Sequence, residues 1–169
     1  GNIIMDYFGD GSGISPVTGK PFGVHIEYYF ENEPLGNAGA LFKIKDKLTS
    51  DFLLLNADAV FDVDFNRFVA FHRKHGGLVT LFTHPNSHPY DSGLIIADKS
   101  GVVNQWLAKE DVRPKYYQNR VNAGLHVIAP AVLEQSDIVA EKVGVMDKNG
   151  KPVKVDLDRQ LLKPLAGTG

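Results

Sequence analysis

The stretch Phe52-Leu53-Leu54-Leu55-Asn56-Ala57-Asp58 decides the fold class of this chain, because four consecutive apolar residues end abruptly in polar ones. A short continuous apolar run is typical of a strand that is covered on both faces. Asp64 follows as an expected helix cap, and an apolar face runs from Phe65 to His72 before Gly76 ends the helix. Residues 78–83 form the next expected strand. This strand–helix–strand succession favours a βαβ unit.

The flanking sequence adds further elements. Strands are expected over residues 24–30, 94–97, 102–107 and 121–128, and helices over 37–48, 129–135 and 156–165. The strands over 94–97 and 102–107 are expected to pair as a hairpin across residues 98–101. Asn37 is the expected N-cap of the first of these helices. Residues 9–21 have the composition of a loop, and residues 147–150 that of a hairpin turn. We therefore expect an α/β fold, a Rossmann-like α/β/α sandwich with a mixed, mostly parallel sheet.

The composition is that of an ordinary globular domain. The chain has 169 residues, of which 43% are hydrophobic and 22% charged, so we expect one folded domain over residues 1–169. It has no cysteine, which excludes disulfides, thiolate metal sites and cysteine nucleophiles. The net charge is −2, and no apolar run nears the ~20 residues needed to cross a bilayer. We therefore expect a cytoplasmic protein with no nucleic-acid or membrane partner.

Both ends of the sequence look like cuts. The chain starts at Gly1 without a methionine and stops at Gly169 directly after a helical pattern. We therefore expect it to be truncated at both ends and to belong to a larger protein.

Two motifs that could suggest a ligand are not supported by their context. In the glycine-rich segment 9–21, Pro21 follows Lys20 where a phosphate-binding loop needs Ser or Thr, and a strand rather than a helix comes next. His72 and His75 lie three residues apart on one expected helix, but no third residue is spaced to complete a zinc site.

Asp58 is the first candidate residue for binding a metal ion. In open α/β sheets, ligands bind beyond the carboxyl ends of strands. A single carboxylate there can hold Mg²⁺ while substrate phosphates fill other positions. The alternative is an Asx turn or a cap, which this motif alone would favour. Asp62 and Asp64 add an Asp-x-Asp pattern, in which Asp64 is better placed as the helix cap.

A second stretch, Glu31-Asn32-Glu33-Pro34-Leu35-Gly36-Asn37-Ala38-Gly39-Ala40-Leu41, precedes the Asn56-Ala57-Asp58 motif. Together they resemble the sugar-1-phosphate nucleotidyltransferases (nucleotide-sugar pyrophosphorylases), whose members typically have Thr and Gly where Asn37 and Ala57 stand. Further matches follow in the family's order: His88-Pro89-Tyr90-Asp91-Ser92, Lys109, Asn122-Ala123-Gly124, and Asp156-Leu157-Asp158 with Leu162-Lys163-Pro164-Leu165. The pattern is most similar to the branch that acts on manno-heptose 1-phosphate with GTP, in bacterial cell-envelope pathways.

The resemblance implies a reaction and a set of ligands. A sugar 1-phosphate, of a heptose or hexose, would attack the α-phosphorus of a nucleoside triphosphate, expected to be GTP, and pyrophosphate would leave. Asp58 would hold Mg²⁺ and, with Lys109 on the sugar phosphate, form the catalytic set. The implied nucleotide-binding residues are Glu31, Leu35, Gly36 and Asn56, and the implied sugar-binding residues are Gly93, Asn122 and Gly124. Glu31 suits guanine, because a carboxylate accepts hydrogen bonds and guanine offers two donors.

Other readings of these residues stay open. Glu31 could be a surface carboxylate, Lys109 a solvated lysine, and Asn122 a turn residue at a strand end. Ala108 stands where many relatives have Glu, which leaves the sugar open. The chain could also be a non-catalytic nucleotide-sugar-binding or regulatory module, or a metal-dependent glycosyltransferase that uses Asp62 and Asp64. A homo-oligomer is a further alternative.

The segments with which the family binds the triphosphate are expected outside these residues. The family's N-terminal glycine-rich loop is not found in the 169 residues. We therefore expect the isolated chain to fold at least in part but not to catalyse nucleotidyl transfer.

Overall fold

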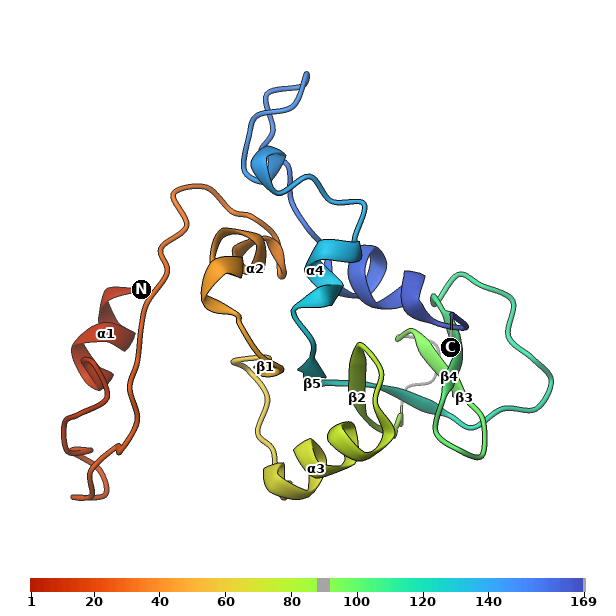
Figure 1. Ribbon diagram of the computed structural model, residues 1–169, viewed down its shortest axis with the longest axis horizontal. Coiled ribbons are helices and arrows are strands. Elements are labelled where there is room, and N and C mark those ends of the chain that lie inside the picture. The colour runs from red at the N-terminus through yellow and green to blue at the C-terminus, as the bar shows by residue number, and fades with distance from the viewer. Residues whose placement is uncertain (88–91, 169) are drawn as a thin grey trace. The chain divides into compact units, whose positions relative to one another are not determined.

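The computed structural model describes residues 1–87 and 92–168, which form two compact units, Gly1–Pro34 and Leu35–Gly169 (Figure 1). The motif residues His88, Pro89, Tyr90 and Asp91 lie outside the described residues. The single domain over residues 1–169 stays a prediction.

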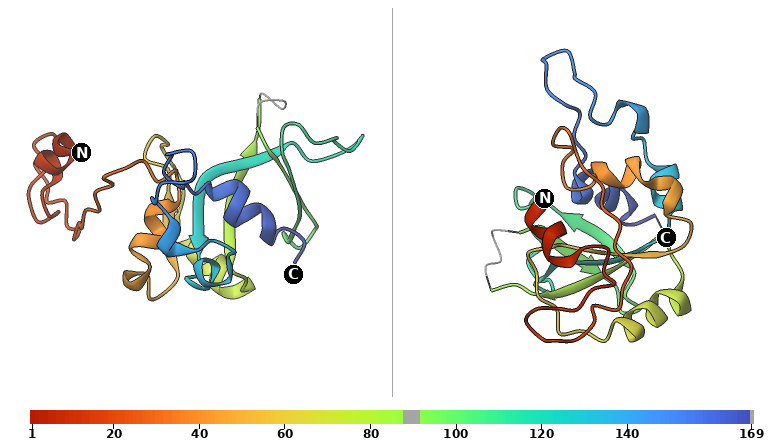
Figure 2. Two further views of the ribbon diagram at one scale, coloured as in Figure 1. Left: turned by 90° about the horizontal axis from the view of Figure 1, so that it is seen from above. Right: turned by 90° about the vertical axis from the view of Figure 1, so that its left-hand side faces the viewer.

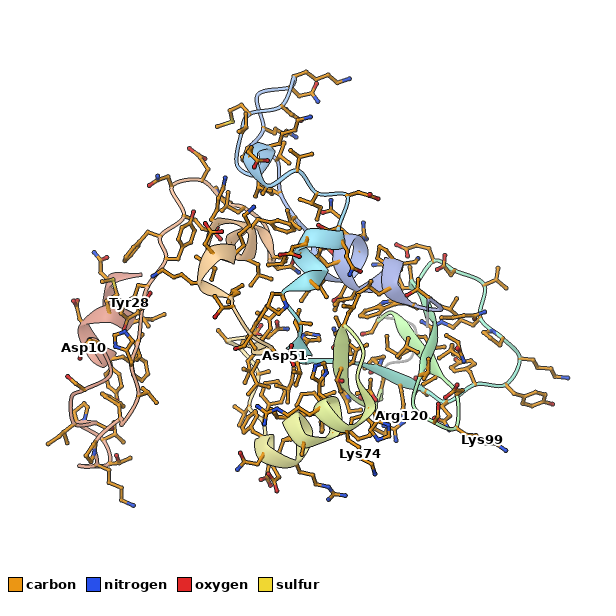
Figure 3. All side chains as sticks on the ribbon, viewed as in Figure 1. Asp10, Tyr28, Asp51, Lys74, Lys99 and Arg120 are labelled. Carbon is orange, nitrogen blue, oxygen red and sulfur yellow. The ribbon has the colours of Figure 1, made fainter. Side chains whose placement is uncertain are left out.

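The first unit consists of helix α1 (Asn2–Phe8) and a long irregular segment. The loop over residues 9–21 is confirmed, with one bridge between Ile14 and Pro21. The strand expected over residues 24–30 is wrong. Here Ile26 N–H donates to the Asp10 carbonyl at 2.8 Å, and the Tyr28 hydroxyl donates to the Gly9 carbonyl at 2.7 Å (Asp10 and Tyr28 are labelled in Figure 3). Alternating residues favour a strand, but a strand forms only beside a partner that completes its ladder.

A three-stranded sheet is the centre of the second unit. Its strands are β1 (Phe52–Leu55), β2 (Val79–Pro85) and β5 (Arg120–Ile128), in the order β1-β5-β2. Both ladders are antiparallel: Phe52 pairs with Ile128, and Val79 pairs with the same Ile128 on the other side. The α/β class is confirmed, but in the described residues the expected mostly parallel sheet is wrong.

The position of β5 explains this difference. The strands β1 and β2, joined through α3 (Phe65–His75), run in the same direction, as the βαβ pattern predicts. They are not neighbours, because β5 comes from later in the sequence and inserts between them in the opposite direction. A local apolar pattern identifies strands but not which strand lies beside which.

Helices cover both faces of this sheet, which confirms the sandwich (Figures 1 and 2). On one face, α2 (Gly39–Lys43), α4 (Ala131–Gln135) and the π-helix η3 (Leu157–Leu162) contribute Phe42, Leu133 and Leu161 to the larger core. On the other face, Phe68 of α3 packs against Leu125 and Val127 of β5. The alternation of β5 side chains thus feeds two separate apolar clusters.

The two expected helix caps have different outcomes. Asp64 is confirmed as the N-cap of α3, since its Oδ1 accepts a hydrogen bond from Arg67 N–H at 3.0 Å. Asn37 is wrong as a cap: α2 starts at Gly39, with Ala38 as N-cap residue. The Asn37 side-chain oxygen instead accepts from Leu157 N–H at 2.8 Å, at the start of η3. The N–H group that Asn37 binds lies 120 positions away, so the local sequence could not predict this hydrogen bond.

A second, two-stranded sheet lies beside the first. It is the expected hairpin of β3 (Leu94–Ala97) and β4 (Val103–Leu107), whose turn is held by Asp98 Oδ1 accepting from Ser100 and Val102 N–H. The remaining elements are single helical turns: η1 (Lys45–Lys47), η2 (Ala140–Lys142) and η4 (Lys163–Leu165). In the part of the chain that the structure describes, no helix combines the length and apolarity that a membrane span requires.

His126 is a polar residue in the centre of the sheet. It is 0% exposed on β5, between β1 and β2. Burial lowers the pKa of His126 to about 4, and the Leu54 backbone raises it by a smaller amount. The imidazole is therefore neutral in the folded protein at pH 5–7, where an unfolded histidine becomes protonated.

We expect the stability of the second unit to fall as the pH is lowered. Between about pH 6.5 and 4, His126 is protonated in the unfolded chain but stays neutral in the folded chain. The free energy of unfolding therefore decreases by about 3 kcal/mol over this range. Urea unfolding at pH 7, 5.5 and 4.5 measures the slope. His126→Gln should flatten it, whereas His25→Gln, at a side chain 77% exposed, should not. An equal slope in wild type and His126→Gln would contradict the assignment.

Candidate functional site

The carboxyl end of β1 and the amino-terminal part of β5 lie side by side at one end of the strands, called here the sheet edge. Because β5 is antiparallel to β1, its first residues lie beside the carboxyl end of β1. Asn56, directly after β1, donates its backbone N–H to the Gly124 carbonyl at 2.9 Å. This edge is where open α/β sheets bind ligands. The structure thus brings Asn56, Asn122 and Gly124 together, as three of the residues expected in the site.

Gly124 forms a bulge in β5. The β5 residues His126 and Asn122 pair with Leu81 and Thr83, so three β5 residues oppose the single residue between these two. Gly124 has a φ of +75°, and a Cβ atom there would lie 2.4 Å from Nδ2 of Asn56. Glycine is therefore required both by the backbone conformation and by the approach of the Asn56 side chain.

Asn122 is held by the same bulge. Four residues of a regular strand span about 13 Å, yet His126 Nε2 lies 2.9 Å from Asn122 Oδ1. Gly124 N–H donates to this oxygen as well, at 3.2 Å. The amide nitrogen of Asn122 donates to Oδ1 of Asp158 at 3.2 Å. With its oxygen between two donors and its nitrogen on a carboxylate, the Asn122 side chain has one orientation.

Asp158 is the residue of this cluster that sequence reasoning did not place in the site. It lies in the first turn of η3 and is half-buried. Burial raises the pKa of the Asp158 carboxyl, the nearby Asp156 raises it further, and the Asn122 hydrogen bond lowers it. The available signal was the Asp156-Leu157-Asp158 match, in which one carboxylate caps the helix through Arg159 N–H and the other points to Asn122.

Asp58 lies in an exposed turn two residues after Asn56. Its carboxylate makes no hydrogen bond or ion pair with the described residues, and within them no group of three or more His, Cys, Asp or Glu side chains could hold a metal ion. A free carboxylate nevertheless fits Mg²⁺, which is commonly held by one or two carboxylates together with substrate phosphates and water. The donor chemistry of Asp58 is therefore compatible with that ion.

Leu35 and Gly36 pack against the strand-like segment before η3. Leu35 is 5% exposed and belongs to the larger core. Its carbonyl accepts from Val155 N–H at 2.8 Å. Gly36 has a φ of +86°, and a Cβ there would lie 2.3 Å from the Val155 carbonyl oxygen. A side chain at residue 36 would therefore collide with the Val155 backbone, which accounts for the glycine.

The other expected site residues lie apart from this cluster. Gly93 precedes β3, where a Cβ atom would come 3.0 Å from Trp106 Nε1. Lys109 is exposed in a turn that Asp111 closes by accepting from Ala108 N–H at 2.8 Å. Glu31 is exposed and belongs to the first unit. Among residues 35–87 and 92–168, no hydrogen bond or ion pair joins Gly93 or Lys109 to Asn122.

A cavity of about 720 Å³ lies beside β2 and the β3–β4 hairpin. Thr83, which pairs with Asn122, lines it, as does Arg120 at the start of β5 (labelled in Figure 3). Arg120 reaches the Thr83 carbonyl at 3.4 Å. The cavity thus reaches the start of β5, but Asn56, Asn122, Gly124 and Asp158 do not line it.

Comparison with known proteins identifies close sequence relatives. A mannose-1-phosphate guanyltransferase of Saccharomyces cerevisiae is 32% identical over 148 residues, which is 84% of this chain and 39% of the relative. A mannose-1-phosphate guanylyltransferase catalytic subunit beta of Drosophila pseudoobscura pseudoobscura is 31% identical over 125 residues, 72% of this chain and 33% of the relative. The chain thus spans about a third to two-fifths of the length of these relatives.

Solved structures share the fold. A protein described as a glucose-1-phosphate thymidylyltransferase from Bacillus anthracis matches with a TM-score of 0.63 and 16% identity, covering 79% of this chain and 50% of its own. HddC from Yersinia pseudotuberculosis matches with a TM-score of 0.57 and 17% identity, covering 81% and 55%. The family model described as nucleotidyl transferase matches residues 6–153. The chain therefore belongs to the nucleotidyl transferase family.

Proposed function

We propose that this chain is part of an enzyme that transfers a nucleotide from a nucleoside triphosphate to a sugar 1-phosphate. The family match over residues 6–153 is the observation that carries the proposal. The relatives named as mannose-1-phosphate guanyltransferases support a sugar 1-phosphate as acceptor and GTP as donor. A heptose or a hexose 1-phosphate is the proposed acceptor.

The proposed reaction is a single displacement. A phosphate oxygen of the sugar 1-phosphate attacks the α-phosphorus of the triphosphate, a new P–O bond forms, and the bond to the β-phosphate breaks to release pyrophosphate. No covalent intermediate with the protein is needed, so positioning and neutralisation of charge supply the catalysis. Mg²⁺, held by Asp58, would neutralise phosphate charge when bound.

The remaining roles follow the chemistry of each group. Lys109, exposed and cationic, would contact the sugar phosphate as a point charge. Glu31 would accept from the two donors on the edge of guanine, with Leu35, Gly36 and Asn56 along the nucleotide. Asn122, Gly124 and Gly93 would face the sugar. These assignments rest on the family motifs and, for Asn56, Asn122 and Gly124, on their contacts with one another.

Asp58→Asn should lower the rate of nucleotidyl transfer about a hundredfold or more while the fold survives. The amide keeps the shape of the exposed side chain but loses the charge that would hold Mg²⁺. Because the chain spans only part of the length of its relatives, the assay uses the complete product of its coding sequence. Pyrophosphate release from GTP and mannose 1-phosphate is followed over a Mg²⁺ titration.

Asp62→Asn is the matched control, since Asp62 is exposed in the same loop. It should leave the rate unchanged. Near-normal turnover of Asp58→Asn at saturating Mg²⁺ would remove Asp58 from the metal site. No pyrophosphate release by the wild type, together with release of the nucleotide from a nucleotide sugar that is lost in Asp62→Asn, would favour the glycosyltransferase alternative. Binding of GTP without turnover by the wild type would favour the regulatory module.

Glu31→Gln should weaken the preference for GTP over UTP about tenfold or more. The amide replaces one acceptor by a donor, which faces a guanine donor and costs about 1–3 kcal/mol. The measurement is the ratio of kcat/KM for the two nucleotides, with Glu33→Gln, an exposed neighbour, as control. An unchanged ratio in Glu31→Gln would place Glu31 outside the base pocket.

A further inference from the structure

Asp158 has an acceptor atom that the fold leaves unused. Its Oδ1 accepts from Asn122 Nδ2 at 3.2 Å, whereas no described residue donates to Oδ2. The carboxyl group is half-buried, and burial of a charged group is costly unless its oxygens find donors. The helix cap at η3 does not need this side chain, because Asp156 supplies the cap.

The neighbouring amide offers the complementary group. Because His126 and Gly124 both donate to Asn122 Oδ1, the Asn122 nitrogen is directed to Asp158. An amide nitrogen carries two hydrogens, and one of them remains after the bond to Asp158. The pair therefore presents one donor and one acceptor side by side, at the sheet edge where Asn56 and Gly124 also lie.

The charge of Asp158 limits the kind of ligand that the Asp158–Asn122 pair can bind. A half-buried carboxylate repels the phosphates of either substrate, and within the described residues no set of metal-binding side chains includes it. A sugar hydroxyl both donates and accepts hydrogen bonds, so it matches a carboxylate next to an amide N–H. We propose that Asp158 determines the sugar specificity of the site by accepting a hydrogen bond from a sugar hydroxyl, with the Asn122 amide as its matching donor.

His126 and Gly124 act through Asn122 as positioning residues. They hold the amide so that its nitrogen, and not its oxygen, faces Asp158. This inference rests on the proposed function, because it takes the bound sugar to be the acceptor substrate.

The test compares Asp158→Asn with wild type in the complete product of the coding sequence. The acceptor is whichever of mannose, glucose and manno-heptose 1-phosphates the wild type turns over best, used together with its single-deoxy analogues. In wild type, one analogue should have a KM raised about tenfold, because it lacks the hydroxyl that donates to Asp158. In Asp158→Asn, the KM for the parent sugar should rise by a similar factor, and that analogue should no longer be disfavoured. The KM for GTP should stay within twofold.

Two further variants separate recognition from structure. Asp156→Asn removes the same charge two residues away and keeps a good helix cap, so the sugar KM should not change. Asp158→Glu retains a carboxylate and should retain discrimination against the analogue. Thermal unfolding checks the fold, and Asp158→Ser replaces Asp158→Asn if the latter does not fold.

The outcomes are distinct. An Asp158→Asn enzyme that keeps the wild-type sugar KM and discrimination overturns the specificity role alone. An equal rise in the KM for sugar and for GTP also overturns it, since that marks a structural effect. Absence of turnover by the wild type with all three sugars overturns the proposed function and this assignment with it.

Discussion

The second unit depends on the insertion of an antiparallel strand between two strands that run the same way. The strand β5 hydrogen-bonds to β1 on one edge and to β2 on the other. Its residues pack under helices on both faces, in two apolar clusters. Since β1 and β2 have no direct ladder in the described sheet, neither would be positioned without β5. The candidate site lies where this strand starts.

The bulge at Gly124 converts this strand into a binding edge. It shortens the distance between Asn122 and His126, and it opens room for Asn56 from the adjacent strand end. A buried histidine, an amide and a half-buried carboxylate thereby form one chain of hydrogen bonds, from His126 through Asn122 to Asp158. This network is satisfied only in part, since the buried Nδ1 of His126 and Oδ2 of Asp158 have no hydrogen-bond partner among the described residues. Asn122 and Gly124 are thus placed by a strand, and Asp158 by the helix η3.

Features set by neighbouring residues could be predicted from the sequence. The strand at 52–55, the helix capped by Asp64 and the hairpin around Asp98 depend on local apolar spacing and turn chemistry. The failures all involve distant partners. The strand expected over 24–30 has no ladder, Asn37 binds Leu157 instead of its own helix, and the sheet order depends on β5. Asp158 was missed as a site residue because only the folded chain places it beside Asn122.

The tie between Leu35 and Val155 also has a consequence for biosynthesis. Val155 N–H donates to the Leu35 carbonyl, and the Val155 carbonyl accepts from Ala38 N–H at 3.2 Å. Helix α2 has five residues, too few to be stable alone, so it depends on that tie and on Leu161 and Leu162 in the same core. During synthesis, the segment that starts at Leu35 therefore cannot form these hydrogen bonds until about 120 more residues have been made. During this interval its apolar side chains lack the partners that bury them in the folded chain, the condition under which incompletely folded chains associate.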